Sequence, residues 1–277
     1  MPAPDRYAVI GHPIAHSRSP QIHSLFAQQT HQHMMYTAID VAPENLAAYV
    51  REFFAAGGRG LNVTVPHKET VIALTGGLSA RAQIAGAANT IVKDADGHLM
   101  ADNTDGAGLV RDLTHNLRVA VNARRVLLLG AGGAARGVLA PLLGLMPREL
   151  VIANRSVERA LALANAFASL GPVSATGYAE LDGAGFELIV NATAASLHSQ
   201  LPPLPPWVLG PTTICYDLVY ANGDTRFTRW AREHGAAQAH MGLGMLVEQA
   251  AESFYLWRGV RADTAPVLSL LREHTPH

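Results

Sequence analysis

Three polar regions stand out in the first half of the chain, in places where a plain fold would not require them. They comprise His16–Pro20, Asn62–Lys68, and the linked segments Gly86–Thr90 and Asp102–Gly106. Hydroxyls, amides, an amine and a carboxylate at the ends of predicted strands could surround a small polyhydroxylated substrate. Simpler roles also exist for three of these residues. Ser19 could cap a helix, Thr64 could fill a strand, and Asp105 could cap the helix that follows it.

The second half of the chain carries the pattern of a dinucleotide-binding turn. An apolar strand, Val126–Leu129, leads into the run GAGGAA and then into a helical stretch. In the pattern G-x-G-x-x-G/A, Gly130 permits a tight turn and Gly132 lets backbone N–H groups approach a pyrophosphate. The small Ala135 lets the helix pack on the strand. A pyrophosphate would lie at the helix N-terminus, where unpaired N–H groups favour an anion. The alternative is a tight glycine turn without a ligand.

The residues after the next predicted strand, Leu150–Ala153, indicate which dinucleotide binds. An NAD site usually carries Asp or Glu there, which binds the ribose 2′-hydroxyl. This chain instead has Asn154, Arg155 and Ser156, followed by Arg159. Two guanidiniums and a hydroxyl suit a 2′-phosphate, so the sequence favours NADP over NAD. The alternative is that both arginines are solvated residues at a helix start.

These motifs lie within an alternation of strands and helices. In the first half we predict strands at Tyr7–Gly11, Met34–Val41 and Leu61–Val65, helices at about 19–30 and 43–56, and a hairpin of Thr90–Lys93 with His98–Ala101. In the second half we predict further strands at Glu187–Val190 and Thr213–Leu218, and helices at Val157–Ser169, Thr225–His234 and Gly244–Trp257.

The order of these elements predicts two α/β domains with a cleft between them. The substrate-binding and catalytic domain, with a mixed sheet, would comprise residues 1–103 and 241–277. The second, a Rossmann-like NADP-binding domain, would comprise residues 104–240.

Composition narrows the classes of partner. The chain has 277 residues, with 21 Lys and Arg against 22 Asp and Glu, a net charge of −1. Such a balance argues against broad binding of nucleic acid or an anionic membrane. No signal peptide is visible, and the apolar window 126–146 contains Arg136 and Pro141, which argues against a membrane span. Cys215 is the only cysteine, which excludes a disulfide within the chain and fits the cytoplasm.

Nine stretches, in order along the chain, resemble the shikimate dehydrogenase family. They are HSRSP (16–20), NVTVPHK (62–68), GAANT (86–90), NTDG (103–106), GAGGAAR (130–136), NRSVER (154–159), NAT (191–193), YDLVY (216–220) and GLGMLVEQAAESF (242–254). Each stretch alone is a weak signal, whereas the ordered series is specific. The resemblance implies reversible NADPH-dependent reduction of 3-dehydroshikimate to shikimate, on the route to aromatic amino acids, by a monomer or homodimer.

The resemblance also implies roles for single residues. Lys68 and Asp105 would be catalytic, because a proton must accompany the hydride. We expect Lys68 to transfer that proton and Asp105 to orient it and bind a neighbouring hydroxyl. The implied substrate contacts are Ser17, Ser19 and Tyr220 for the carboxylate, and Asn62, Thr64, Asn89, Asp105 and Gln249 for ring hydroxyls. The implied NADP contacts are Gly130, Ala131, Gly132, Gly133, Ala134, Asn154, Arg155, Ser156, Arg159, Thr193, Leu218 and Gly242. No metal is implied.

Because Gln249 lies on the last strong helix, that helix should fold back onto the N-terminal domain. The chain departs from the family's pattern at Ala80, Pro141, Ser196, Leu218 and Ala221–Asn222, and Pro141 should kink or shorten its helix. None of these positions is Lys68 or Asp105.

The sequence allows three alternatives to this function. A quinate/shikimate dehydrogenase with relaxed substrate or cofactor use would share most of the site. A non-catalytic NADP-binding sensor would keep the glycine turn but lose the Lys–Asp pair, and both of those residues are present. A metal site at His31-Gln32-His33 lacks an accompanying cluster of Cys or carboxylate residues, so two surface histidines are the simpler interpretation.

Overall fold

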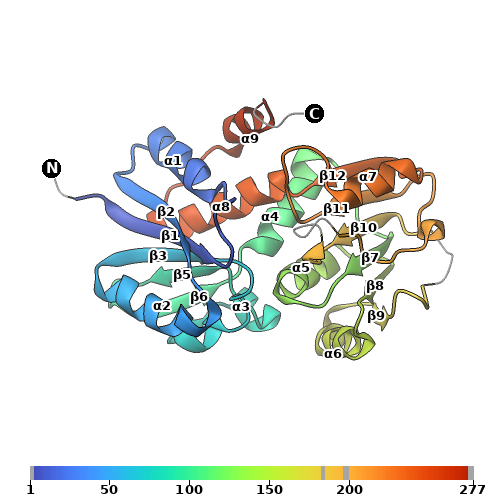
Figure 1. Cartoon of the computed structure of the whole chain (residues 1–277), viewed down its shortest axis with the longest axis horizontal. Helices are drawn as coiled ribbons and strands as arrows, with labels where there is room; N and C mark the ends of the chain where they lie inside the picture. Colours follow the sequence, from blue (N-terminus) through green and yellow to red (C-terminus); the bar gives the residue numbers. More distant parts are fainter. Residues whose placement is uncertain (1–2, 182–184, 196–199, 274–277) are drawn as a thin grey trace. The chain divides into compact units, whose positions relative to one another are not determined.

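The computed structural model describes residues 3–181, 185–195 and 200–273. The chain folds into two compact α/β units (Figure 1). One contains the residues up to Gly108 together with Leu246–Leu270, and the other contains Leu109–Met245 and the chain from Leu271 onward. Within the described ranges, every helix is too short or too polar to cross a bilayer.

The first unit is built on a six-stranded mixed sheet, as the sequence predicts. Its strands are β1 (Asp5–Gly11), β2 (Met34–Asp40), β3 (Gly58–Val63), β4 (Gly77–Leu78), β5 (Thr90–Lys93) and β6 (Leu99–Asp102). Their spatial order is β2-β1-β3-β5-β6-β4. Strand β1 is parallel to β2 and β3, whereas β5 is antiparallel to both β3 and β6.

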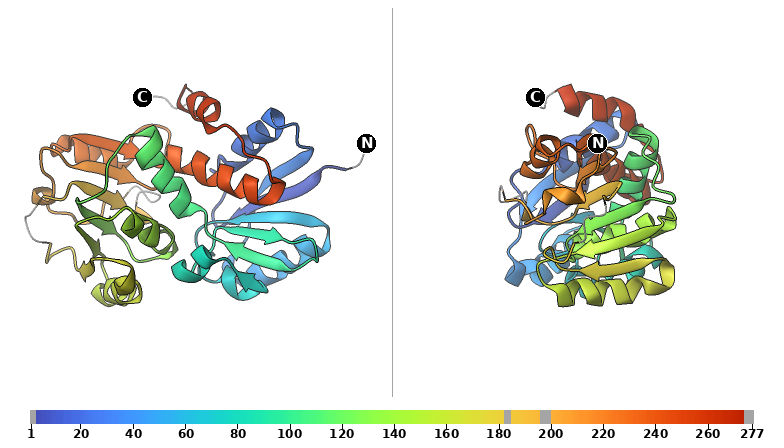
Figure 2. Two further views of the ribbon diagram at one scale, coloured as in Figure 1. Left: turned by 180° about the vertical axis from the view of Figure 1, so that it is seen from behind. Right: turned by 90° about the vertical axis from the view of Figure 1, so that its right-hand side faces the viewer.

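Helices cover both faces of this sheet. They are α1 (Ser19–Gln29), α2 (Leu46–Ala55), α3 (Ala80–Ala85) and α8 (Leu243–Arg258), with short 3-10 turns η1 (Pro43–Asn45) and η2 (Val71–Leu74). Two further helices, α4 (Asp105–Arg111) and α9 (Thr264–Glu273), begin in this unit. Successive side chains of a strand point to opposite faces. Accordingly, Ile10 and Leu61 share a core with Phe54 of α2, while the ring of Tyr7 packs at a tilt against Trp257 of α8, with 4.9 Å between ring centroids. Figure 2 shows the orange-red α8 from the opposite side.

Two local predictions in this unit were wrong. Ser19 is the first residue of α1 and not its N-cap, because the chain enters the helix at Arg18. Thr64 lies beyond the end of β3, since its carbonyl accepts a hydrogen bond from His67 N at 2.9 Å and begins a turn. Thr64 therefore does not fill a position within the strand predicted at Leu61–Val65.

The second unit is a parallel six-stranded sheet. Its strands are β7 (Arg125–Leu129), β8 (Glu149–Ala153), β9 (Val173–Thr176), β10 (Leu188–Asn191), β11 (Ile214–Asp217) and β12 (Gln238–Met241). Their order, β12-β11-β10-β7-β8-β9, is the doubly wound arrangement of dinucleotide-binding folds. In such a sheet ligands bind beyond the carboxyl ends of the strands, where the order reverses. Here that point lies between β7 and β10.

Helices cover this sheet on both faces as well. They are α5 (Gly133–Gly144), α6 (Val157–Phe167) and α7 (Arg226–Glu233), with a π-helical turn η3 (Asp112–Asn116) and 3-10 turns η4 (Ala168–Leu170) and η6 (Pro206–Val208). Helices α5 and α6 pack against Leu128 and Ile152, whereas α7 packs against Leu127 on the other face. Helix α5 continues past Pro141 and ends at Gly144, still a helix of 12 residues.

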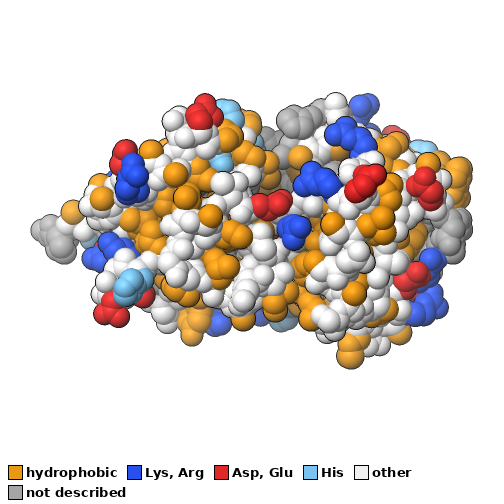
Figure 3. All heavy atoms as spheres, turned by 90° about the horizontal axis from the view of Figure 1, so that it is seen from below, with side chains coloured by type: hydrophobic (Ala, Val, Ile, Leu, Met, Phe, Trp, Pro, Cys, Tyr) orange, Lys and Arg blue, Asp and Glu red, His pale blue; other side chains and the backbone are white. Residues whose placement is uncertain are grey.

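The surface carries charges of both signs. On the face drawn in Figure 3, acidic and basic side chains lie singly or in small mixed groups among apolar and neutral ones. Function is therefore best sought in local arrangements of side chains rather than in a broad field of one sign.

Candidate active site

The structure brings Lys68 and Asp105 together. Lys68 Nζ lies 2.5 Å from Asp105 Oδ2, and the two side chains are only 13% and 6% exposed. The sheet explains why residues so far apart in sequence meet. Thr90, the first residue of β5, is paired with Asn62 near the end of β3 and with Asp102 at the end of β6. The segments that carry the amine and the carboxylate therefore leave the sheet at the same edge.

Asn89 completes this group from the start of β5. Its side-chain nitrogen donates to Asp105 Oδ1 at 2.9 Å, to Thr104 Oγ1 at 2.8 Å and to Gln249 Oε1 at 3.1 Å. Its own side-chain oxygen accepts from Thr104 N at 2.8 Å. Because Gln249 lies on α8, the bond to Asn89 confirms that this helix folds back onto the N-terminal unit.

Asp105 does not serve as a simple helix cap. It is the first residue of α4, and its backbone N–H donates to Asn103 Oδ1 at 3.1 Å. Its carboxylate is instead divided between two partners, with one oxygen on Lys68 and the other on Asn89. This division holds the carboxylate in one orientation beside the amine.

A second charged group anchors the residues that precede Asp105. Arg81 donates to both oxygens of Asp102, at 2.7 and 3.0 Å, and to Glu252 of α8 at 3.1 Å. Burial raises the pKa of Asp102, but the bonds from Arg81 and Ser79 outweigh it and hold that pKa below its usual value. Ala80 therefore does not leave the neighbouring Arg81 without carboxylate partners.

Two of the residues predicted to bind a substrate carboxylate, Ser17 and Ser19, lie where the chain passes from β1 into α1. Ser17 Oγ accepts a bond from Ser19 N at 3.3 Å, and Ser19 is buried. This loop adjoins the turn after β3, since His12 N donates to Val65 O at 3.0 Å next to Thr64. Within the described residues, no hydrogen bond joins Ser17, Ser19 or Thr64 to Lys68. Tyr220 belongs to the other unit.

Asn62 is held entirely by protein groups. Its side-chain nitrogen donates to Asn89 O, Thr90 Oγ1 and Ser253 Oγ at 3.0–3.1 Å, and its oxygen accepts from Tyr36 Oη at 2.7 Å. The sequence suggested neither Tyr36 nor Ser253 as a site residue. Ser253 could have been found, because it lies one helical turn after Gln249 on α8, whereas Tyr36 carries no local signal.

In the second unit, the glycine turn joins β7 to α5. Gly130 adopts φ +103°, a conformation that L side chains rarely take, and Ala135 is fully buried in the core. Gly132 is the N-cap of α5 without a side-chain cap, and nothing lies within 4 Å of the place where a Cβ would stand. The N-terminus of α5 thus has no side-chain cap and lies at the switch point of the sheet.

The end of β8 presents the predicted 2′-phosphate contacts. Arg155 and Arg159 are exposed, and neither guanidinium forms an ion pair with any residue that the structure describes. Ser156 caps α6 by accepting from Arg159 N at 3.4 Å, and its hydroxyl donates to Glu158 at 2.9 Å. Asn154 closes the turn by donating to Ser156 O at 2.9 Å. The two cations are therefore available to an incoming anion.

The residues predicted for the nicotinamide side lie at the ends of neighbouring strands. Thr193 follows β10 and donates to Asn191 Oδ1 at 2.7 Å. Leu218 follows β11, and a Cβ on Gly242 would stand 2.4 Å from its carbonyl oxygen. Gly242 is thus required where β12 passes this close to Leu218. The departure at Ser196 lies outside the described residues.

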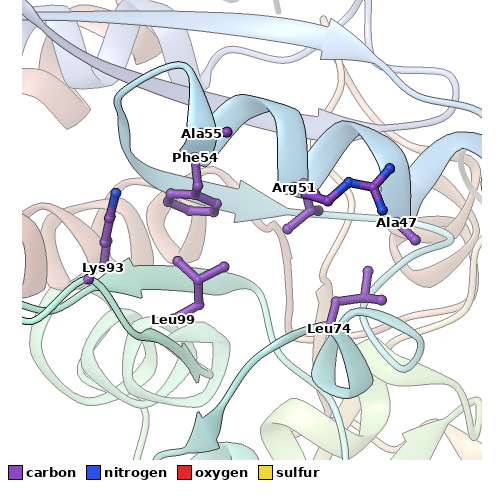
Figure 4. Close-up of a pocket in the computed structure, with 9 residues that line it drawn as sticks. Ala47, Arg51, Phe54, Ala55, Leu74, Lys93 and Leu99 are labelled. Carbon is purple, nitrogen blue, oxygen red and sulfur yellow. The ribbon is translucent and has the colours of Figure 1, made fainter.

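A separate hollow of about 520 Å³ lies in the first unit, between α2 and the β5–β6 hairpin (Figure 4). Phe54, Leu74 and Leu99 contribute apolar side chains to its lining, together with the charged Arg51 and Lys93. None of the predicted site residues lines it.

Comparisons with known proteins show to which family the chain belongs. Residues 9–91 match the shikimate dehydrogenase substrate binding domain, residues 112–198 match the shikimate/quinate 5-dehydrogenase model, and residues 242–272 match the shikimate 5′-dehydrogenase C-terminal domain. A shikimate dehydrogenase (NADP(+)) of Methylococcus capsulatus is 55% identical over 98% of this chain and 97% of its own length. The chain belongs to the shikimate dehydrogenase family.

Solved structures place the fold in the same family. The Ael1 enzyme of Pseudomonas putida is 49% identical, with a TM-score of 0.88 over 96% of this chain and 98% of its own. The shikimate 5-dehydrogenase of Thermus thermophilus, solved with NADP(H) and shikimate, is 34% identical, with a TM-score of 0.85 over 97% of this chain and 99% of its own.

Proposed function

We propose that this chain reduces 3-dehydroshikimate to shikimate, reversibly and with NADPH, on the route to aromatic amino acids. The observation that carries the proposal is the buried Lys68–Asp105 pair, held by Asn89 at the edge of the first sheet. We assign substrate binding to the first unit and NADP binding to the second.

Lys68 is the proton donor of the reduction. When the carbonyl carbon receives a hydride, the C=O bond becomes a C–O single bond and its oxygen needs a proton. The Lys68 ammonium supplies that proton and later recovers one from solvent, and the same group accepts the proton in the oxidation. Asp105 keeps the amine in place and accepts a hydrogen bond from a neighbouring substrate hydroxyl.

The remaining polar residues orient the substrate. Asn89, Gln249 and Thr64 bind ring hydroxyls, and Ser17 and Ser19 bind the carboxylate with Tyr220. These carboxylate contacts are neutral donors, so the anion is held by hydroxyls and dipoles. We assign Asn62 an indirect role, in which it supports Asn89, because its side-chain amide already bonds to other protein groups.

NADPH, when bound, supplies the hydride. The open N-terminus of α5 at Gly132 would receive the pyrophosphate, and Arg155 and Arg159 would bind the 2′-phosphate. Thr193, Leu218 and Gly242 would line the nicotinamide side.

The test is the reduction of NADP on adding shikimate, followed by the absorbance of the reduced nicotinamide. We expect turnover with shikimate and NADP, and much slower turnover with quinate or with NAD. Absence of any shikimate-dependent reduction would contradict the proposal. Equal turnover on quinate would favour the broader quinate/shikimate activity, which the comparisons do not favour. Binding of NADP without turnover would favour a sensor.

We further propose that the enzyme acts in the cytoplasm, as a monomer or homodimer. Expression in cells followed by fractionation tests the first statement, and sedimentation of the purified protein tests the second.

A further inference from the structure

A continuous set of contacts runs from a buried aromatic cluster to the Lys68–Asp105 pair. Tyr36 Oη donates to Asn62 Oδ1 at 2.7 Å, and Asn62 Nδ2 donates to the backbone oxygen of Asn89 at 3.1 Å. Asn89 in turn donates to Asp105. All of these residues lie in the first unit.

The far end of this set is rigid. The Tyr36 ring stacks on His23, with ring centroids 4.1 Å apart and planes only 11° from parallel. His23 is fully buried and also contacts the rings of Phe26 and Phe254. Because Tyr36 belongs to β2 and His23 to α1, the phenol is fixed from two elements at once.

Nearer the pair, the side-chain amide of Asn62 is restricted to one orientation. The Asn62 nitrogen is shared among Asn89 O, Thr90 Oγ1 and Ser253 Oγ, and all four residues are buried. The amide can reach these acceptors in only one of its two flipped orientations. The Tyr36 hydroxyl selects that orientation, because it donates to the oxygen at the opposite end of the amide.

We infer that Tyr36 is a positioning residue for the proton transfer, acting through Asn62 and Asn89 on Asp105 and Lys68. It touches neither member of the pair. Its hydroxyl fixes the Asn62 amide, the amide fixes the Asn89 backbone, and the Asn89 side chain fixes the carboxylate that holds the amine. This inference rests on the proposed function.

The decisive variant is Tyr36→Phe, which keeps the ring on His23 and removes only the hydroxyl. We expect kcat for shikimate oxidation to fall about tenfold, because misplacing a reacting group slows the step it performs. The KM for shikimate should stay within about twofold of its original value, since the binding groups remain. Tyr49→Phe is the matched control, because Tyr49 is a half-buried tyrosine of α2 that stacks on Phe53 away from the pair. It should leave kcat unchanged.

A measurement without substrate or cofactor separates positioning from general loss of structure. The chain contains only two lysines, Lys68 and Lys93. Acetic anhydride acetylates both, and mass spectrometry gives the rate for each. The rate at Lys93 serves as the internal reference for the rate at Lys68. In Tyr36→Phe the rate at Lys68 relative to Lys93 should rise about fivefold, the effect of weakening one hydrogen-bonded arrangement. In Tyr49→Phe the ratio should not change.

The outcomes are distinguishable. If the wild-type protein does not oxidise shikimate, the proposed function fails, whatever the variants do. If the wild type is active and Tyr36→Phe keeps its kcat, or if the Lys68 acetylation ratio does not move, the positioning role is wrong. A rise in KM that matches the fall in kcat/KM would also overturn it, since Tyr36 would then support the binding surface alone.

A second variant tests the route through Asn62. Ser253→Ala removes another partner of the same amide, so its effect on kcat should be less than additive with that of Tyr36→Phe. Fully additive losses would show that the two residues act separately and would exclude Asn62 as the common link.

Discussion

Asn89 donates to Asp105 on the carboxylate oxygen that Lys68 leaves free. The amide-to-carboxylate distance is 2.9 Å and the amine-to-carboxylate distance is 2.5 Å. A carboxylate held at both oxygens cannot rotate about its last bond without breaking one contact. The pair is therefore set in one geometry before any substrate arrives, which is what proton transfer to a bound oxygen requires.

The first prediction concerns the proton donor. Lys68→Ala should lower kcat by about 10²–10⁴-fold, the range typical of a lost general acid. Binding of shikimate should weaken far less, because the lost interaction is used mainly in the transition state. Steady-state kinetics with a direct binding measurement will separate the two. Lys93→Ala is the control, and it should behave as the wild type. Equal losses in binding and turnover would refute the assigned role of Lys68.

The second prediction concerns cofactor choice. Arg155→Ala should weaken NADP about 10- to 100-fold, because a charge-assisted contact to the 2′-phosphate is lost. NAD, which lacks that phosphate, should bind almost as before. Titration of both nucleotides gives the ratio. Arg148→Ala, at an exposed arginine just before β8, is the matched control. Unchanged NADP affinity in Arg155→Ala would remove the 2′-phosphate assignment.

The third prediction contrasts two glycines of one turn. Gly132→Ala places a methyl group in open space, so thermal stability should change by no more than a few degrees while NADP binds about tenfold more weakly. Gly130→Ala should lower the unfolding temperature, because its φ of +103° disfavours a side chain. Melting curves and NADP titrations on both variants test this. If Gly132→Ala bound NADP normally, the pyrophosphate would not lie where we place it.

The fourth prediction concerns acid stability. Burial lowers the pKa of His23 from 6.5 to about 3, and the polar contact with Asn62 opposes that lowering only in part. As the pH falls from 6.5 towards 3, the unfolded chain gains a proton on this residue that the folded chain does not. Stability is therefore lost over that window, by about 1.4 kcal/mol per pH unit.

His23→Phe tests this effect, because it removes the titrating group and keeps an aromatic ring in the cluster. Its unfolding temperature should decline less steeply than that of the wild type between pH 6 and about pH 4. His234→Phe, at an exposed histidine of the second unit, is the control. Parallel declines in the wild type and His23→Phe would show that other groups govern acid unfolding.

Much of the fold could be read from local patterns. The apolar runs of β1, β7 and β8, the hairpin of β5 and β6, and the glycine turn before α5 all lie within a residue or two of their predicted positions. These features depend on side chains adjacent in sequence, so periodicity and turn chemistry are sufficient. The three unpredicted strands, β4, β9 and β12, all lie at the edge of a sheet. Each is only two to four residues long and pairs with one neighbouring strand, whereas the seven-residue edge strand β2 was predicted.

The sequence by itself determined the chemical groups of the site, namely an amine, a carboxylate, amides and a phosphate-binding turn in a recognisable order. Only the tertiary structure decided how they are held. It joined Asn89 to Gln249 of α8 and Tyr36 of β2 to Asn62 of β3. It also showed that the side-chain amide of Asn62 forms its hydrogen bonds with other protein groups. These contacts join elements far apart in the chain, and hydrogen-bond geometry between them depends on the packing of whole helices and strands.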